Sequence, residues 1–367
     1  MEKDISKIIS HFKIDGEFAS ATPLLTGHIN DSYIVYVKEN SQPTYFLQWI
    51  NNYIFKDVPG LMENILTVTE HLAAKKNRHE NQDVDIHLIP GIDGKYFYLD
   101  SEDNYWRLYN YIAGTHSYDI VDNQHIAFEG GKAFGKFSSD LADLPATRLH
   151  DTIPNFHNME TRLAAFFQSV IDDKAGRRKE VPNELSFVEE RAAVMLTIPE
   201  MISNRELPLR ITHNDTKFNN ILFDEKNHAV CIVDLDTVMP GSLLFDFGDA
   251  IRTGANFADE DEKDLSKVDI NLPIYEAYTR GFIASTCKSL TSNEIAHLAF
   301  AARFMTFIIG LRFLTDYLDG DPYFRTQYAD HNLVRARVQF RLVEKMEENA
   351  LYMEQIVQNA VNEYLTK

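Results

Sequence analysis

The sequence predicts an α+β protein with a β-rich N-terminal lobe and a mainly helical C-terminal lobe. The chain has 367 residues, which is more than one hydrophobic core usually serves, so two packed lobes are expected. The first 112 residues contain short alternating apolar runs that are typical of strands, and helical patterns prevail from Gly114 onward. We therefore place the lobes at residues 1–112 and 113–367.

The strands of the N-terminal lobe follow one another closely. Residues 18–24, 32–38 and 45–50 have strand-like alternation, and the turn-like segment TGHIND separates the first two. After Pro59 and Gly60, the stretch LMENILTVTEHLAAKK has apolar residues at helical spacing. HLIP, KYFYLD and YWRLYNYI are again strand-like, and the tetrad SEDN separates the last two as a hairpin turn does. This lobe is therefore expected to be a meandering sheet with one helix.

The charge and composition exclude several classes of partner. A formal net charge of −19 repels nucleic acid and anionic membrane surfaces, so neither is expected to bind. No secretory signal and no apolar run of membrane-spanning length is visible. Two cysteines are too few for a disulfide framework, which favours the cytoplasm. Nothing indicates an obligate partner, so we expect a monomer.

Polar residues lie at both ends of an apolar hairpin in the segment ITHNDTKFNNILFDEKNHAVCIVDLDTVMPG. A turn centred near Asn227 places Asn220 opposite Asp234, with Cα atoms about 4.5–5.5 Å apart. An amide oxygen and a carboxylate this close are hard ligands that suit Mg²⁺. Asp215 lies in the preceding loop, where it can act as a proton acceptor. His213 is expected to brace that loop.

The pattern His213-x-Asp215-x-x-x-x-Asn220, followed by Asp234, resembles the catalytic loop and metal-binding Asp of protein kinases and aminoglycoside phosphotransferase-type kinases. The stretches GHIND, LQWIN, HNDTKFNNILFD, VDLDTVMPG, FDFGDAIRTGAN and RFLTDYLDGDPYF are similar to the N-acetylhexosamine 1-kinase branch of that superfamily. The resemblance implies a bilobal protein-kinase-like fold and transfer of the γ-phosphoryl group of ATP to the anomeric hydroxyl of an N-acetylhexosamine.

The same resemblance implies a role for each residue of the loop and its hairpin. Asp215 would accept the proton of the sugar hydroxyl, and Asn220 with Asp234 would hold Mg²⁺. Asp246 would hydrogen-bond the catalytic loop. Asp236 is interpreted as a solvated strand end, with a second metal-ligand role as the alternative.

The nucleotide would bind to the N-terminal lobe. Segment 26–31, with Gly27, His28 and Asn30, sits where kinases cover the phosphates, and a glycine lets backbone N–H groups approach them closely. His28 is also a candidate sugar contact. Tyr109 and Tyr111 occupy the place of the hinge, which indicates a purine nucleotide without separating ATP from GTP.

One position departs from the family pattern. Most relatives carry a phosphate-contacting Lys on the third strand, where this chain has Gln48. The usual helix partner of that Lys, for which Glu63 is the candidate, is then expected to be a surface carboxylate. Lys217 is a catalytic candidate that would supply part of the missing charge.

The acceptor is expected near a long buried helix that begins at a capping box, Thr291-Ser-Asn-Glu294. Arg303 and Arg312 lie inside this helix on opposite faces, so each must be paired or functional.

The resemblance favours Arg312 and Tyr323 as sugar contacts, and an ion pair between Arg312 and Asp316 is the alternative. Two other functions stay open. One is a kinase for homoserine, choline, an aminoglycoside or a ketosamine, and the other is a nucleotide-binding pseudokinase.

Overall fold

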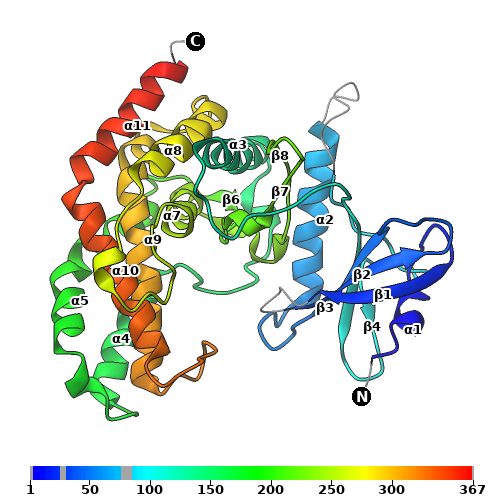
Figure 1. Ribbon diagram of the computed structural model, residues 1–367, viewed down its shortest axis with the longest axis horizontal. Coiled ribbons are helices and arrows are strands. Elements are labelled where there is room, and N and C mark those ends of the chain that lie inside the picture. The colour runs from blue at the N-terminus through cyan, green and yellow to red at the C-terminus, as the bar shows by residue number, and fades with distance from the viewer. Residues whose placement is uncertain (1–2, 25–29, 76–84, 366–367) are drawn as a thin grey trace. The chain divides into compact units, whose positions relative to one another are not determined.

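The computed structural model describes residues 3–24, 30–75 and 85–365. The chain forms two compact units (Figure 1). The first unit comprises Met1–Ser117, Asp143–Pro154 and Asn220–Pro240, and the second comprises Tyr118–Ala142, Asn155–Asn219 and Gly241–Lys367. The division into lobes after residue 112 stays a prediction.

Strands are concentrated in the first unit and long helices in the second. The strands are β1 Phe18–Leu24, β2 Asp31–Val37, β3 Tyr45–Ile50, β4 Tyr98–Leu99, β5 Tyr105–Asn110, β6 Arg210–Thr212, β7 Ile221–Phe223, β8 Ala229–Ile232 and β9 Met239–Gly241. The α-helices are α1 Ile5–Ile9, α2 Val58–Lys75, α3 Gln124–Asp140, α4 Met159–Asp172, α5 Pro182–Met195, α6 Thr197–Ser203, α7 Leu243–Gly254, α8 Leu272–Thr286, α9 Ser292–Asp319, α10 His331–Glu348 and α11 Ala350–Leu365. Single 3₁₀ turns are η1 Ala146–Arg148, η2 Arg178–Glu180, η3 Phe218–Asn220, η4 Leu235–Thr237 and η5 Leu265–Lys267.

The first unit contains an antiparallel sheet with the strand order β1-β2-β3-β5-β4. The strands predicted at residues 18–24, 32–38 and 45–50 and the hairpin around SEDN are therefore confirmed. The predicted strand HLIP is wrong, because within it only Leu88 forms an isolated bridge, to Tyr109.

The two faces of this sheet differ in chemistry because successive side chains of a strand point to opposite sides. Leu47 on β3 and Trp106 and Leu108 on β5 belong to one buried apolar cluster. Arg107 lies between the last two, so its side chain is on the opposite face, and it pairs in register with Gln48. The sheet therefore carries a buried charge on the face that does not hold this cluster.

The hairpin of β7 and β8 differs from its predicted register by one residue. Ile221 pairs with Ile232, and the N–H of Val233 donates to Asn220 O at 2.9 Å, so Asn220 lies opposite Val233 rather than Asp234. The turn is centred on Lys226, because Phe223 pairs with Ala229, and a register shift between Leu222 and Phe223 then moves the pairing part of the way toward the predicted one.

The second unit is built around α9, which begins with the predicted capping box at Thr291 and Glu294. Helix α7 packs closely on it, because a Cβ at Gly248 would lie only 2.2 Å from Ala301 O. By length and composition α9 is long and apolar enough to cross a membrane, but 72% of its apolar window is buried inside the protein, as in a core helix.

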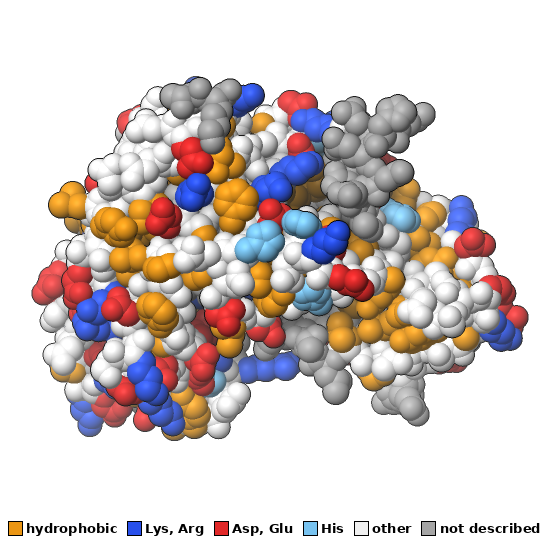
Figure 2. All heavy atoms as spheres, turned by 45° about the horizontal axis from the view of Figure 1, so that its top comes forward, with side chains coloured by type: hydrophobic (Ala, Val, Ile, Leu, Met, Phe, Trp, Pro, Cys, Tyr) orange, Lys and Arg blue, Asp and Glu red, His pale blue; other side chains and the backbone are white. Residues whose placement is uncertain are grey.

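On the face drawn in Figure 2, acidic and basic side chains are interspersed.

Candidate active site

Two carboxylates of α7 hold the loop at residues 212–219, which we call the catalytic loop, in the second unit. Asp246 accepts hydrogen bonds from the N–H groups of His213 and Asn214 at 2.8 and 2.7 Å. Asp249 accepts one from the N–H of Thr216 at 3.0 Å. Both carboxylates are buried, so they satisfy backbone groups that water does not reach. The expectation that Asp246 hydrogen-bonds this loop is confirmed.

Burial raises the pKa of Asp246 to about 7, against the two backbone N–H groups that favour its charged form. The neighbouring Arg252 is also buried and donates from Nε and Nη2 to Asp249 Oδ1 at 3.0 and 2.9 Å. Arg252 therefore neutralises the second carboxylate that holds the loop.

Two histidines support the loop without facing solvent. His157 Nε2 donates to Asn214 O at 3.1 Å, because a carbonyl oxygen can only accept. Burial lowers the pKa of His157 to about 4, so the ring is neutral. The ring of His213 is fully buried and packs edge-on against Phe134 and Phe137. His213 thus braces the loop as predicted, through its ring packing and its N–H group.

Asp215 and Lys217 present their side chains on the accessible side of the loop. Lys217 Nζ lies 3.0 Å from Asp215 Oδ1, and the two side chains are 44% and 28% exposed. Burial raises the pKa of Asp215, but the charge and hydrogen bond of Lys217 outweigh it and hold that pKa below its usual value. The charge of Asp215 in turn raises the pKa of Lys217. The structure therefore brings the carboxylate of Asp215 and the ammonium group of Lys217 together, a pairing that the sequence analysis did not predict.

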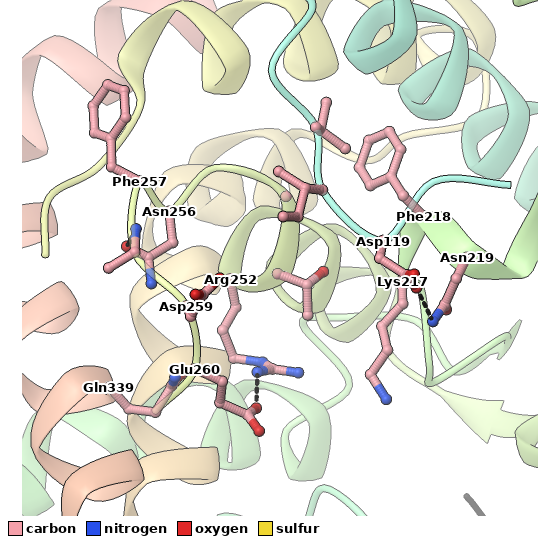
Figure 3. A pocket seen from close by; sticks show the side chains of 15 residues that line it. Asp119, Lys217, Phe218, Asn219, Arg252, Asn256, Phe257, Asp259, Glu260 and Gln339 are labelled. Atoms are coloured by element: carbon pink, nitrogen blue, oxygen red, sulfur yellow. Dashed lines mark hydrogen bonds and ion pairs between the residues drawn. The ribbon is translucent and has the colours of Figure 1, made fainter. Parts of the chain in front are cut away.

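A pocket of about 240 Å³ adjoins this loop and lies within the second unit (Figure 3). Lys217 and Arg252 reach it from the catalytic loop and from α7. Arg252 Nη1 lies 3.3 Å from Glu260 Oε1 and is already paired with Asp249, so its charge is compensated. Lys217 is the more available of these two cations.

Arg312 on α9 lies among aromatic rings. Its guanidinium is 5.4 to 5.7 Å from the ring centres of Phe156, Tyr323 and Phe324. The predicted alternative, an ion pair with Asp316, does not form, because that carboxylate accepts from the N–H groups of Tyr323 and Phe324 at 2.8 and 2.9 Å. Asp316 therefore shapes the loop that carries Tyr323.

A second arginine, Arg162 on α4, lies close enough to influence the charge of Arg312. Burial, together with the charge of Arg162, lowers the pKa of Arg312 to about 10. Arg162 Nη2 donates to Phe156 O at 3.1 Å, and its Nε has no partner among the described residues. By contrast, Arg303 lies 3.5 Å from Glu347, so the two arginines of α9 differ in their pairing.

The predicted metal ligands lie in the first unit, on either side of the β7–β8 hairpin. Asn220 is buried, and Asp234 is exposed with φ at 58°, a left-handed conformation that is uncommon outside glycine. The described residues contain no group of three or more His, Cys, Asp and Glu side chains that could hold a metal ion. A site with one amide and one carboxylate fits Mg²⁺, which takes its other ligands from phosphates and water.

The sheet face opposite the apolar cluster carries an ion pair that the sequence analysis missed. Arg107 on β5 is 1% exposed and pairs through Nη1 with Asp236. Its Nε and Nη2 donate to Gln48 Oε1 at 3.0 and 2.7 Å. The interpretation of Asp236 as a solvated strand end is wrong, because this carboxylate is 3% exposed and compensates a buried cation.

The remaining nucleotide candidates are only partly within the described residues. Gly27 and His28 lie outside them. Asn30 donates from Nδ2 to Asp236 Oδ2 at 2.6 Å. Tyr109 is buried, and the N–H of Tyr111 donates within the sheet to Thr44 O at 2.9 Å, so that N–H group already has a partner.

Some of the residues that the sequence analysis missed had a detectable signal in the sequence. Arg107 is a charged residue within the apolar run YWRLYNYI, where burial requires a partner. Asp249 and Arg252 are spaced i,i+3 in the mainly apolar helix FDFGDAIRTG. His157 and Arg162 had no signal in the sequence, since their roles depend on contacts far along the chain.

Comparison with known proteins agrees with this architecture. The chain resembles an aminoglycoside phosphotransferase from Alicyclobacillus acidocaldarius, with 10% identity, a TM-score of 0.62 and 96% of each chain covered. It also resembles a microcompartment-associated aminopropanol kinase, with 15% identity, a TM-score of 0.59, and 96% of this chain and 98% of that one covered. A choline kinase from Cryptosporidium parvum has 12% identity and a TM-score of 0.58, with 97% of this chain and 98% of that one covered.

These likenesses, together with the antiparallel sheet and the helical second unit, confirm the α+β protein-kinase-like fold. Residues 32–277 match the family described as the phosphotransferase enzyme family. Because the match covers more than half of the chain and includes the catalytic loop and its hairpin, the chain belongs to the phosphotransferase enzyme family.

Proposed function

We propose that this protein transfers the γ-phosphoryl group of ATP to the anomeric hydroxyl of an N-acetylhexosamine and releases the sugar 1-phosphate. One observation supports this proposal most directly. The catalytic loop presents Asp215 beside Lys217 on its accessible side, while Asp246 and Asp249 fix its backbone from within. A positioned carboxylate with a neighbouring cation is the arrangement that phosphoryl transfer needs. The protein is proposed to act in the cytoplasm as a monomer.

Each group of the second unit has a distinct task in this proposal. Asp215 is ionised at neutral pH because Lys217 keeps its pKa low, so it can orient the acceptor hydroxyl and accept its proton. Lys217 opposes the negative charge of the phosphoryl group.

In the first unit, Asn220 and Asp234 are proposed to hold Mg²⁺ on the nucleotide phosphates. Their amide and carboxylate oxygens are the ligand types that this ion prefers. When bound, the ion neutralises charge that develops on the phosphate oxygens.

The charge around Arg312 favours an uncharged, hydroxyl-rich acceptor over an ammonium compound. The charge of Arg162 lowers the pKa of Arg312, so the two guanidinium groups lie close enough to repel each other. Two guanidinium groups repel a cationic acceptor and donate to the carbonyl oxygen of an acetamido group. We therefore place the acetamido group of the acceptor near Arg312, with the exposed ring of Tyr323 beside it.

A panel of acceptors tests the proposal. The wild type is incubated with MgATP and N-acetylgalactosamine, N-acetylglucosamine, the two corresponding free amino sugars, choline and homoserine, and the product is located by ³¹P NMR. We expect a C1-phosphate on at least one N-acetylated sugar and at least roughly tenfold lower kcat/KM for the free amine, which differs only in the acetyl group.

Two other outcomes would change the assignment. Faster phosphorylation of choline or homoserine would keep the kinase and refute the sugar acceptor. Tight MgATP binding without turnover on any acceptor would refute the enzyme and favour a pseudokinase.

A further inference from the structure

The first unit contains a buried polar network that joins four segments of the chain. Arg107 on β5 donates to Gln48 on β3 at 2.7 and 3.0 Å and pairs with Asp236 in η4. Gln48 Nε2 in turn donates to Ser32 Oγ on β2 at 3.1 Å, which fixes the orientation of its amide. Arg107 is 1% exposed, so this guanidinium is held by protein groups rather than by water.

Glu63 on α2 does not take part in this network. Gln48 on β3 is neutral, and Glu63 Oε2 lies 2.8 Å from His150 Nε2, with its carboxylate 69% exposed. The predicted surface role of Glu63 is therefore confirmed. The buried ion pair that the described residues of this unit form links β5 to η4 and not β3 to α2.

The network also reaches the two segments that are proposed to meet the nucleotide. Asp236 Oδ2 accepts from Asn30 Nδ2 at 2.6 Å, and Asn30 Oδ1 accepts from the N–H of Asn51 at 3.0 Å. Asp234 lies two residues before Asp236 and adopts a left-handed backbone conformation, which its surroundings must stabilise. Holding Asp236 therefore restrains both the turn that carries Asp234 and the residue that follows segment 25–29.

We propose that Arg107 is a positioning residue for nucleotide binding, acting through Asp236 on Asp234 and Asn30. This inference rests on the proposed function for the identity of the nucleotide. A guanidinium suits the task because its planar fork holds Gln48 and Asp236 at the same time, whereas an ammonium group is a point charge without that geometry.

The experiment measures nucleotide affinity separately from turnover. Calorimetry gives the dissociation constant of ATP with and without Mg²⁺ for the wild type, Arg107→Met, Arg107→Lys and the double variant Gln48→Lys/Arg107→Met. Steady-state kinetics gives KM for MgATP and kcat, and thermal unfolding reports folding. Leu108→Ala is the matched control, because its side chain is fully buried on the other face of the same strand.

We expect Arg107→Met to weaken MgATP binding at least roughly tenfold and to raise KM more than it lowers kcat. Arg107→Lys keeps the charge and folds, but it should recover only part of the affinity. Gln48→Lys/Arg107→Met should bind better than Arg107→Met, since a cation returns opposite the vacated position. Leu108→Ala should lower the melting temperature while the affinity of the folded protein stays within twofold.

Unchanged MgATP affinity in Arg107→Met and Arg107→Lys would overturn the inference, as would an equal loss in Leu108→Ala. If Arg107→Met does not fold, the MgATP affinities of Arg107→Lys and Leu108→Ala are compared to test the role of Arg107. If the wild type binds MgATP but phosphorylates no sugar, the proposed acceptor is wrong. The role of Arg107 is then still tested by the MgATP affinities of the variants. A wild type that binds no MgATP contradicts both.

Discussion

The two sides of the catalytic loop differ in how their charged residues are held. Asp215 and Lys217, on the accessible side, are 28% and 44% exposed and pair with each other. Asp246 and Asp249, on the inner side, are 3% exposed, and both accept from backbone N–H groups of the loop. Residues that hold the loop are therefore buried and bonded to its main chain, whereas the residues that are proposed to meet substrate keep an accessible side chain.

The accessible side should control the rate. Replacing Asp215 by Asn removes the proton acceptor and keeps the shape, so kcat is expected to fall about 10³-fold. The free energy of unfolding should change by less than about 1 kcal/mol, because the side chain is partly exposed and contributes little packing. Steady-state kinetics and urea unfolding of the two proteins check both parts. A fall in kcat of less than tenfold would refute Asp215 as the base.

The inner side should control stability. Asp249→Asn leaves Arg252 buried without its main carboxylate and weakens the bond to Thr216, which is expected to cost about 3–5 kcal/mol of unfolding free energy. Urea unfolding measures this loss. A matched surface variant, Asp143→Asn, removes an exposed carboxylate bound to Lys75 and should change little. Equal effects of the two variants would contradict the structural role of Asp249.

The inner side should also give the protein a pH dependence. The folded pKa of His157 is about 4 and its unfolded value is about 6.5, so the unfolded state binds more protons between these values. The stability contributed by neutral His157 is thus present above pH 6.5 and is lost as the pH falls toward 4, by about 3 kcal/mol in total.

Urea unfolding at a series of pH values measures this dependence. His157→Gln keeps a donor for Asn214 O and removes this contribution, so the variant should lose less stability than the wild type as the pH falls from 6.5 to 4. Asp246, whose folded pKa of about 7 lies above its unfolded value of 3.8, contributes the opposite trend in both proteins. An unchanged profile would show that His157 is not its source.

Lys217 should have the smallest of these effects. Lys217→Ala removes one cation at an accessible position, so kcat is expected to fall by about tenfold, while unfolding changes by less than about 0.5 kcal/mol. Lys226→Ala, in the exposed β7–β8 turn, is the control for loss of a surface charge. Turnover that survives intact would remove Lys217 from the catalytic groups.

Local patterns predicted the strands, the capping box at Thr291 and the catalytic loop, because each depends on residues close together in the chain. The pairing of Arg107 with Asp236 spans 129 residues and could not be inferred from either neighbourhood alone. The hairpin register was one residue in error because the turn is centred on Lys226 and not on Asn227, and the register shift between Leu222 and Phe223 corrects only part of that difference.

The acceptor region was predictable only in part. Arg312 stood out in the sequence as a cation in an apolar helix. It forms no ion pair with Asp316 because the following loop folds back and donates its N–H groups to that carboxylate, which the sequence does not show. Arg162 lies on a different helix, and its position near Arg312 depends on how α4 and α9 pack.

Native-state hydrogen exchange at the amide of Thr216 tests most directly whether holding the loop and acting on substrate are separate tasks. In the wild type this amide donates to Asp249 and should be protected. We predict that Asp215→Asn keeps this protection while turnover is lost, and that Asp249→Asn loses it. Equal loss of protection in Asp215→Asn would contradict the account, because the fall in turnover would then follow from disorder of the loop.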